Sequence, residues 1–152
     1  MRPHLANEPQ PRDDAMIEVD ELGLAQLVWR VLCCRAAVGA MTRTGAGGRI
    51  INVAARPALE WRTGAGMVAY AASKAAVAAA TVALAEEVAK DGILVNAVAP
   101  SIMDTPANRA AMPKADHAAW PKVAEVAATI VFLASPANKV TRGAVVPVYG
   151  RS

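Results

Sequence analysis

Cysteine is scarce in this sequence, and its scarcity excludes two common classes of protein. Only two cysteines occur among the 152 residues, and they are neighbours, Cys33 and Cys34. Adjacent cysteines almost never bridge each other, which excludes a disulfide scaffold and favours a reducing, cytoplasmic location. The cysteines and the two histidines do not show the spacing of zinc ligands, so no metal site is expected.

Aromatic residues and clustered charges are also scarce. Aromatic residues make up 4% of the chain, and 16 basic against 13 acidic residues leave a formal net charge of only +3. The basic residues are scattered singly along the sequence. A nucleic-acid groove needs clustered cations and stacking rings, so nucleic acid is not an expected partner.

The chain also lacks a clear secretory signal and a clear membrane span. Residues 1–14 contain three prolines and no apolar core, so we expect a disordered tail rather than a signal peptide. The longest apolar stretch, residues 67–85, is mostly alanine and carries Lys74 in its middle. Because a central lysine costs about 2.5–3.5 kcal/mol to insert, we do not expect this stretch to cross a membrane.

The composition is that of one globular domain, expected over residues 15–152, with 55% hydrophobic and 19% charged residues. Apolar spacing predicts helices over about residues 15–41, 67–90 and 121–135, and strands over residues 49–55, 93–99 and 143–149. This alternation predicts right-handed βαβ units and a parallel sheet covered on both faces. The fold class is therefore α/β, with Pro147 expected at a sheet edge.

Three strands make a thin, doubly wound, Rossmann-like sheet, about half of a full dinucleotide-binding fold. The missing part is the N-terminal half, in which a strand leads through a glycine-rich turn to a phosphate-binding helix. The glycines of residues 44–48 precede a strand, whereas a phosphate cradle follows a strand and opens a helix. We therefore expect these glycines only to end the first helix.

Tyr70 and Lys74 form a candidate catalytic pair. They lie four residues apart in the predicted long helix, so both project from one face. An ammonium beside a phenol favours the phenolate and lowers the tyrosine pKa from about 10 toward neutrality. Such a tyrosine exchanges protons at pH 7. By spacing alone, however, a half-buried ring beside a solvated ammonium is the commoner interpretation.

The surrounding motifs favour the chemical interpretation of this pair. Three segments follow in order, GGRIINVAA at 47–55, YAASKAAV at 70–77 and VNAVAP at 95–100. In this order the chain resembles the short-chain dehydrogenase/reductase family over about residues 33–148. The resemblance implies an oxidoreductase that uses NAD or NADP on a small-molecule substrate. It further implies that Tyr70 donates the proton, while Lys74 binds the nicotinamide ribose and lowers the tyrosine pKa.

Residues 104–116 (DTPANRAAMPKAD) resemble the substrate-loop region of the dihydropteridine reductases within that family. The resemblance implies a pterin-like or other small cyclic substrate. It also implies that Thr105 hydrogen-bonds the nicotinamide carboxamide and that the backbone near Ile102 contacts the cofactor. Thr105 followed by proline is also a good helix N-cap, and the two interpretations are compatible.

The sequence departs from the family pattern near the expected site. Ala54 and Ala55 stand where the family has a serine, and Gln26 stands near the position of a family asparagine. Alanine cannot donate a hydrogen bond, and losing one oxyanion donor typically costs about 2.7–4 kcal/mol with a carbonyl substrate. A quinonoid ring spreads the charge that develops on hydride transfer, so it depends less on such a donor. Dihydropteridine reductases also lack this serine, which agrees with the resemblance. The loop before Tyr70 is about two residues longer than usual.

The missing half and the apolar helix suggest two further expectations. Without a pyrophosphate site, this chain alone should bind the dinucleotide weakly. The helix over residues 67–90 is apolar nearly all round and needs cover on every side. In the family, helices matching about residues 20–42 and 67–90 pack against a partner subunit, which implies a homo-oligomer. The alternative to an enzyme is a truncated, inactive fragment that keeps only these dimerisation helices.

Overall fold

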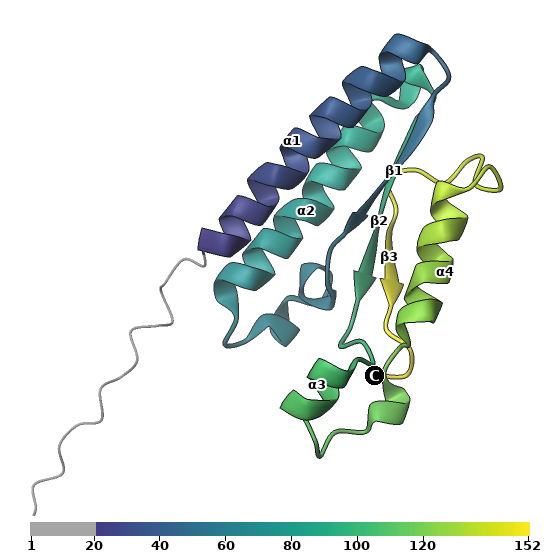
Figure 1. The fold of residues 1–152 in the computed structure, drawn as a ribbon. Helices are drawn as coiled ribbons and strands as arrows, with labels where there is room; N and C mark the ends of the chain where they lie inside the picture. The colour runs from purple at the N-terminus through teal and green to yellow at the C-terminus, as the bar shows by residue number, and fades with distance from the viewer. Residues whose placement is uncertain (1–20) are drawn as a thin grey trace, which may run out of the picture.

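The computed structural model describes residues 21–152, which form a sheet with helices on both faces (Figure 1). The helices are α1 (Glu21–Thr44), α2 (Val68–Glu87), α3 (Pro106–Ala111) and α4 (Val123–Ala134). The strands are β1 (Gly48–Val53), β2 (Ile93–Pro100) and β3 (Val145–Val148). Four short 3₁₀ turns complete the described chain: η2 (Arg56–Ala58), η3 (Trp61–Gly64), η4 (Ala89–Asp91) and η5 (His117–Ala119). The predicted tail over residues 1–14 lies outside the described residues.

All three strands are parallel, in the order β1-β2-β3, which confirms the predicted α/β class. The register places Gly48 opposite Ile93 on the β1 side and Ala97 opposite Val145 on the β3 side. Pro147 is exposed and lies in the edge strand β3, as predicted, where a missing N–H breaks no ladder. β1 forms the other edge, and no strand among residues 21–152 pairs with its outer side.

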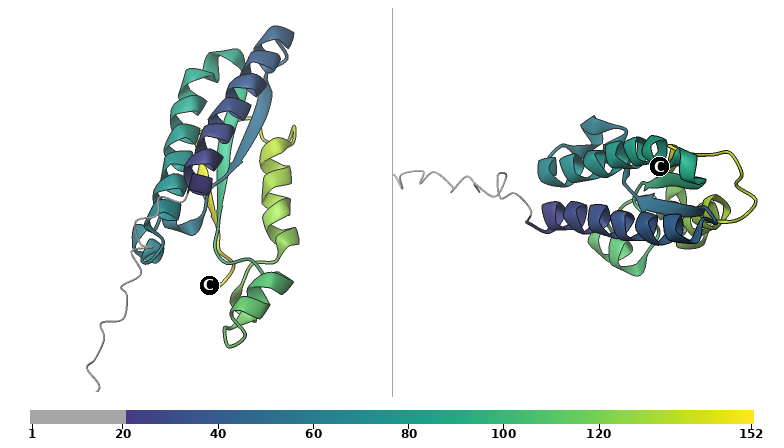
Figure 2. Two further views of the ribbon diagram at one scale, coloured as in Figure 1. Left: turned by 60° about the vertical axis from the view of Figure 1, so that its left-hand side comes forward. Right: turned by 90° about the horizontal axis from the view of Figure 1, so that it is seen from above.

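Helices α1 and α2 lie side by side on one face of the sheet, and α4 covers the other face (Figures 1 and 2). The core between α2 and β2 contains two groups of small or branched side chains. The first is Ala54, Ala58, Val77, Ala78 and Ala99, and the second is Ala85, Val88, Ile93 and Val95. Because β2 has a neighbour on each side and helices over both faces, all of its residues except Leu94 are buried.

Helix α2 is buried on one side only, so the cover that its apolar composition predicts for the other side is not supplied by the described residues. Its buried residues are Ser73, Lys74, Val77, Ala78, Thr81 and Ala85. Val68 and Val82, in contrast, are 64% and 45% exposed. By length and composition α2 could also cross a membrane, a test that core helices of soluble proteins pass as well. Here the buried side of α2 includes polar side chains, those of Ser73, Lys74 and Thr81.

The glycines of residues 44–48 end α1 and turn the chain into β1, as predicted. Gly45 and Gly47 have φ values of 66° and 67°, a region that glycine adopts at no steric cost. A Cβ on Gly47 would also lie 2.6 Å from the carbonyl oxygen of Gly92. The segment precedes a strand and opens no helix, so it forms a connection and not a phosphate cradle.

Two parts of the fold contain short elements that apolar spacing does not predict. The segment between β1 and α2, expected as a plain loop, contains η2 and η3, and the polar segment after β2 contains α3. These elements are one or two turns long, so they leave no apolar periodicity in the sequence. Thr105 caps α3 and a proline follows it, which confirms the predicted helix start.

Asn96 ties the central strand to the loop that leads into β3. It is fully buried, its Nδ2 donates to the carbonyl oxygen of Thr141 at 2.8 Å, and its Oδ1 accepts from the backbone N–H of Ala144 at 3.0 Å. Asn138, also buried, donates to the same carbonyl of Thr141 at 3.1 Å. These side-chain bonds satisfy backbone groups that lie beyond the end of the β2–β3 ladder.

Replacing Asn96 by leucine is expected to lower the free energy of unfolding by about 1–3 kcal/mol. The substitution leaves the N–H of Ala144 without a partner and removes one bond to Thr141. Urea unfolding followed by circular dichroism measures the change. Lys139→Leu, on the exposed surface of the same loop, is the control and should alter stability by less than about 0.5 kcal/mol. Equal stabilities of the Asn96 and Lys139 variants would contradict the assigned role.

Candidate active site

A cavity of about 480 Å³ lies where β1 and β2 end, next to the start of α2. The carboxyl ends of parallel strands are where open α/β sheets bind their ligands. Four separate stretches of chain line the cavity: residues 55–57 with Thr63, residues 67–70, residues 100–112, and the C-terminal Ser152. The cavity, called the cleft below, contains two of the predicted site residues, Tyr70 and Ile102.

Tyr70 lies in the first turn of α2, and its side chain reaches the wall of the cleft. The residue is 38% exposed and lines the cleft, so its side chain is partly covered. Burial raises the pKa of Tyr70 above its ordinary value, and the positive charge of Arg30 on α1 opposes this rise. The phenol is therefore protonated at neutral pH.

Lys74 lies one turn further along α2, beneath Tyr70, and is 8% exposed. Its Nζ donates to the carbonyl oxygen of Val53 at 3.4 Å and lies 5.6 Å from the centre of the Tyr70 ring. The structure thus brings the predicted pair together on one face. Burial, aided by repulsion from Arg30, lowers the pKa of Lys74 below its ordinary value.

The predicted lowering of the Tyr70 pKa by Lys74 is wrong in this structure. The ammonium lies over the face of the ring and donates to the backbone of β1, so it does not pair with the phenol oxygen. Without that pairing, burial is the largest influence on the pKa of Tyr70, and it favours the neutral phenol.

Ile102 and Thr105 occupy different positions relative to the cleft. Ile102 is 44% exposed on its wall, whereas Thr105 is not a lining residue and caps the start of α3. The Thr105 Oγ1 accepts from the backbone N–H of Asn108 at 3.2 Å. Asn108 lines the cleft and donates from Nδ2 to the carbonyl oxygen of Met103 at 2.8 Å. Thr105 therefore shapes the wall by holding α3 in place.

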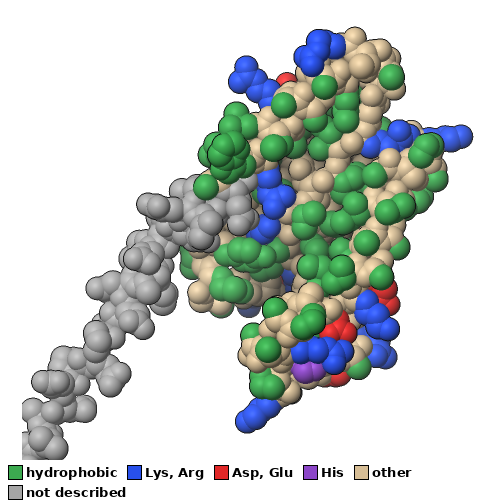
Figure 3. Space-filling view, viewed as in Figure 1, with side chains coloured by type: hydrophobic (Ala, Val, Ile, Leu, Met, Phe, Trp, Pro, Cys, Tyr) green, Lys and Arg blue, Asp and Glu red, His purple; other side chains and the backbone are tan. Residues whose placement is uncertain are grey.

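Charged side chains gather over α3, at the lower end of the view in Figure 3. The Arg109 guanidinium donates to both carboxylate oxygens of Asp104, from Nε at 2.5 Å and from Nη2 at 2.9 Å. This pair joins the two ends of the short segment that carries Thr105. Within residues 21–152, no three acidic, histidine or cysteine side chains gather as a metal site would require.

Sequence reasoning missed Arg56, which follows the predicted Ala54 and Ala55 directly and lines the cleft. Both alanines are buried, and only Ala55 reaches the wall. The Arg56 Nε donates to Glu60 Oε2 at 2.7 Å, and its guanidinium lies 4.9 Å from the centre of the Tyr149 ring. The sequence signal that could have identified Arg56 was its position directly after the motif that ends at Ala55. Its approach to Tyr149, in contrast, depends on the tertiary fold.

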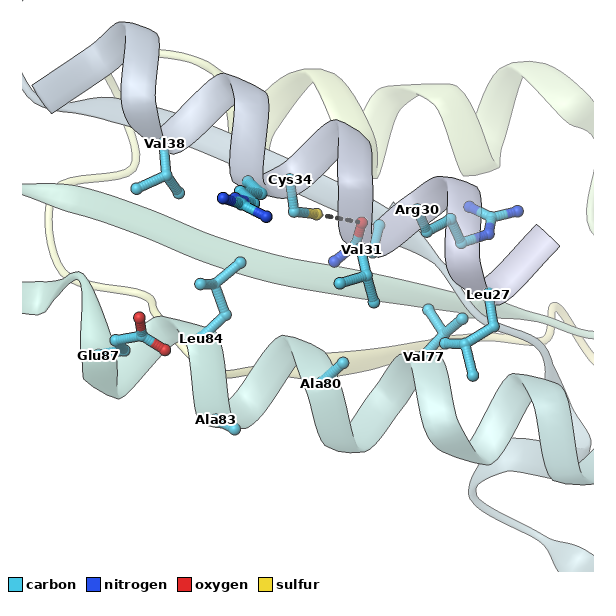
Figure 4. A pocket seen from close by; sticks show the side chains of 12 residues that line it. Leu27, Arg30, Val31, Cys34, Val38, Val77, Ala80, Ala83, Leu84 and Glu87 are labelled. Carbon is cyan, nitrogen blue, oxygen red and sulfur yellow. Dashed lines mark hydrogen bonds between the residues drawn. The ribbon is translucent and has the colours of Figure 1, made fainter. Parts of the chain in front are cut away.

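A second cavity of about 420 Å³ lies between α1 and α2 (Figure 4). Its walls are mostly aliphatic, with Leu27, Val31, Val38, Val77 and Leu84 from the two helices. Cys34 points into it and donates to the side-chain oxygen of Asn52 at 3.6 Å (Figure 4). Burial raises the pKa of the Cys34 thiol, so this sulfur is a poor nucleophile.

Comparison with known proteins gives matches over most of this chain. A family model described as enoyl-(acyl carrier protein) reductase matches residues 27–150. The 3-oxoacyl-[acyl-carrier-protein] reductase FabG of Pseudomonas aeruginosa is 38% identical over 112 residues, which cover 68% of this chain and 44% of that protein. The cis-4-hydroxycyclohexanecarboxylate dehydrogenase of Sinomonas cyclohexanicum is 37% identical over 145 residues, covering 89% of this chain and 54% of that protein.

A solved structure shows the same arrangement of elements. It is described as an NAD(P)-dependent gluconate 5-dehydrogenase from Beutenbergia cavernae with bound NADP. The TM-score is 0.64 at 35% identity, and the match covers 74% of this chain and 48% of that one. The present chain thus spans about half the length of the relatives that it matches.

Proposed function

Because this chain belongs to the short-chain dehydrogenase/reductase family, we propose that it transfers hydride between NAD or NADP and a small cyclic substrate, with Tyr70 as the proton donor. The observation that carries the proposal is the position of Tyr70. It reaches a cleft at the carboxyl ends of parallel strands, one helical turn from a buried lysine. Its raised pKa supports the role of an acid, because the phenol holds its proton at neutral pH.

The residues around Tyr70 fit the nicotinamide half of the cofactor. Lys74 is a buried ammonium with a single, long hydrogen bond to Val53 among the described residues, so it retains donors for the ribose hydroxyls. Thr105 and the backbone near Ile102 would hold the carboxamide. When bound, the nicotinamide ring supplies or accepts the hydride. Tyr70 holds and delivers the proton at its hydroxyl oxygen.

The cleft wall supports a substrate that leaves little charge on one oxygen. Ala55 offers no side-chain donor at the point where the sequence departs from its family. A pterin-like quinonoid ring, in which conjugation spreads the charge, meets this condition better than a simple ketone, whether cyclic or open-chain. The test is NADH and NADPH oxidation with a quinonoid dihydropterin, and with cyclic and open-chain ketones. We expect turnover of the cyclic compounds, with the quinonoid dihydropterin turned over faster than the cyclic ketones. Turnover of the open-chain ketones alone would overturn the proposal.

A second candidate is a non-catalytic chain that self-associates, and the edge of β1 that no strand within residues 21–152 covers favours it. A parallel strand with an unpaired, partly apolar edge is a template for association. Both candidates place the protein in the cytoplasm, where its free cysteines Cys33 and Cys34 would stay reduced. Binding of NADH or NADPH separates the two, since the second candidate needs none.

We propose further that α1 and α2 pack against the same helices of a second copy. Both helices carry exposed apolar side chains beside the cavity between them, including Trp29 at 66%, Leu32 at 46% and Val82 at 45% exposure. Hydrophobic side chains are visible along α1 in Figure 3. A two-fold pairing of this surface would cover the side of α2 that a single chain leaves open.

Leu32→Glu is therefore expected to weaken self-association about tenfold or more, because it places a charge in an apolar interface. Sedimentation at micromolar concentrations measures the dimer population. The control is Thr42→Glu, which adds the same charge to an exposed position on α1. A wild-type chain that sediments as a monomer would contradict the proposed interface.

A further inference from the structure

Arg56 is the one charged side chain among the described residues that line the cleft beside Tyr70. The other lining side chains are neutral, and three of them are methionines, Met67, Met103 and Met112. Ser152, the last residue of the chain, also lines the cleft and carries an α-carboxylate. A single cationic side chain on a wall of apolar and uncharged polar side chains selects among ligands by charge. The structure shows no ion pair between Arg56 and the carboxylate of Ser152, so the guanidinium is not neutralised by it.

The fold holds the Arg56 side chain in place without using all of its donors. Nε donates to Glu60 one helical turn away, and the guanidinium plane lies near the Tyr149 ring. That ring packs on the core group under α2, so its position is fixed. The terminal amino groups of Arg56 have no hydrogen-bond partner within residues 21–152. These amino groups are therefore hydrogen-bond donors that are held near one orientation and remain available to a ligand.

We propose that Arg56 binds a carboxylate of the substrate, so that the cleft takes a small cyclic carboxylate with its ring against the methionines. This inference rests on the proposed function, and within it favours an acidic cyclic substrate over a neutral pterin. A guanidinium donates to both oxygens of a carboxylate, which fixes orientation as well as position. Methionine side chains adapt to the shape of an aliphatic ring.

Glu60 affects the affinity of this site for an anion without preventing Arg56 from binding one. The Arg56 and Glu60 side chains are 31% and 42% exposed, and an ion pair this open to water contributes little. The Glu60 carboxylate therefore orients Arg56 in the empty cleft, but it also repels an incoming anion. Removing the charge of Glu60 should strengthen carboxylate binding, whereas removing the charge of Arg56 should abolish the preference for a carboxylate over a neutral ligand.

The experiment titrates the full chain with two probes of one shape, cyclohexanecarboxylate and cyclohexanecarboxamide, by calorimetry at neutral pH. Wild type should bind the carboxylate about tenfold more tightly than the amide. Arg56→Gln should bind the two equally, and Arg56→Lys should keep part of the preference. Glu60→Gln should bind the carboxylate more tightly and the amide unchanged. Arg62→Gln, on the exposed surface of η3, is the matched control and should behave as wild type.

Equal binding of both probes by wild type, no binding of either, or a preference that survives Arg56→Gln would overturn the inference. Misfolding would weaken binding in every variant. Tighter carboxylate binding by Glu60→Gln could therefore not result from misfolding. Failure of the proposed function is distinguishable. A carboxylate preference without Tyr70-dependent turnover would overturn only the function, and Tyr70-dependent turnover without the preference would overturn only the role of Arg56.

Discussion

Tyr70→Phe is expected to lower turnover by about 10²–10⁴-fold, the usual contribution of a positioned acid. The change removes one oxygen and keeps the ring that packs at the start of α2. Within residues 21–152 the Tyr70 hydroxyl has no hydrogen-bond partner, so its loss leaves no buried group unsatisfied. The fall should therefore appear in kcat, while thermal stability stays near that of wild type.

The pH profile gives this prediction a second readout. An acid acts in its protonated form, and burial raises the pKa of Tyr70. Activity in the direction of reduction should be present below that raised pKa and be lost as the pH rises through it. The residual activity of Tyr70→Phe should not show this loss.

Tyr149→Phe is a matched control for Tyr70→Phe, because it removes a hydroxyl that is buried without a hydrogen-bond partner. The Tyr149 ring, which lies against Arg56, is kept. Turnover of this variant should stay within a few-fold of wild type. If Tyr70→Phe were as active as Tyr149→Phe, Tyr70 would not be the proton donor.

The 152-residue chain is expected to bind NADH and NADPH with a dissociation constant of order millimolar, about 4 kcal/mol of binding. Affinity for a dinucleotide in this kind of fold comes largely from a pyrophosphate at a helix N-terminus. In residues 21–152, glycines lead into a helix only at Gly64 and Gly66 before α2, and the turns η2 and η3 separate them from the end of β1, so they do not form a tight turn from strand to helix. The chain therefore offers contacts to the nicotinamide half alone, from Tyr70, Lys74, Thr105 and the backbone near Ile102.

Titration of the purified chain with NADH and NADPH, by fluorescence or calorimetry, measures this affinity. Lys74→Ala should weaken the remaining binding about tenfold, because it removes the buried ammonium expected at the ribose. Lys90→Ala, on the exposed surface beyond α2, should leave binding unchanged. Micromolar affinity in the wild-type chain would show that the chain does hold a phosphate site.

The sequence by itself determined the order of elements, the class of sheet and the family. Each of these depends on local or repeated signals, such as the apolar runs of β1 and β2, the alanine-rich periodicity of α2 and the spacing of Tyr70 and Lys74. The position of Pro147 at an edge was predictable for the same reason, because proline lacks a donor wherever it stands.

Only the tertiary structure decided the electrostatics and the composition of the cleft. The pKa of Tyr70 depends on burial and on what Lys74 contacts, and its partner Val53 lies on another element. Arg56 and Tyr149 are distant in sequence, and meet because β1 and β3 end on the same side of a parallel sheet. Periodicity reports which side of an element faces inward, whereas a charge responds to every group that the fold brings within a few ångströms of it.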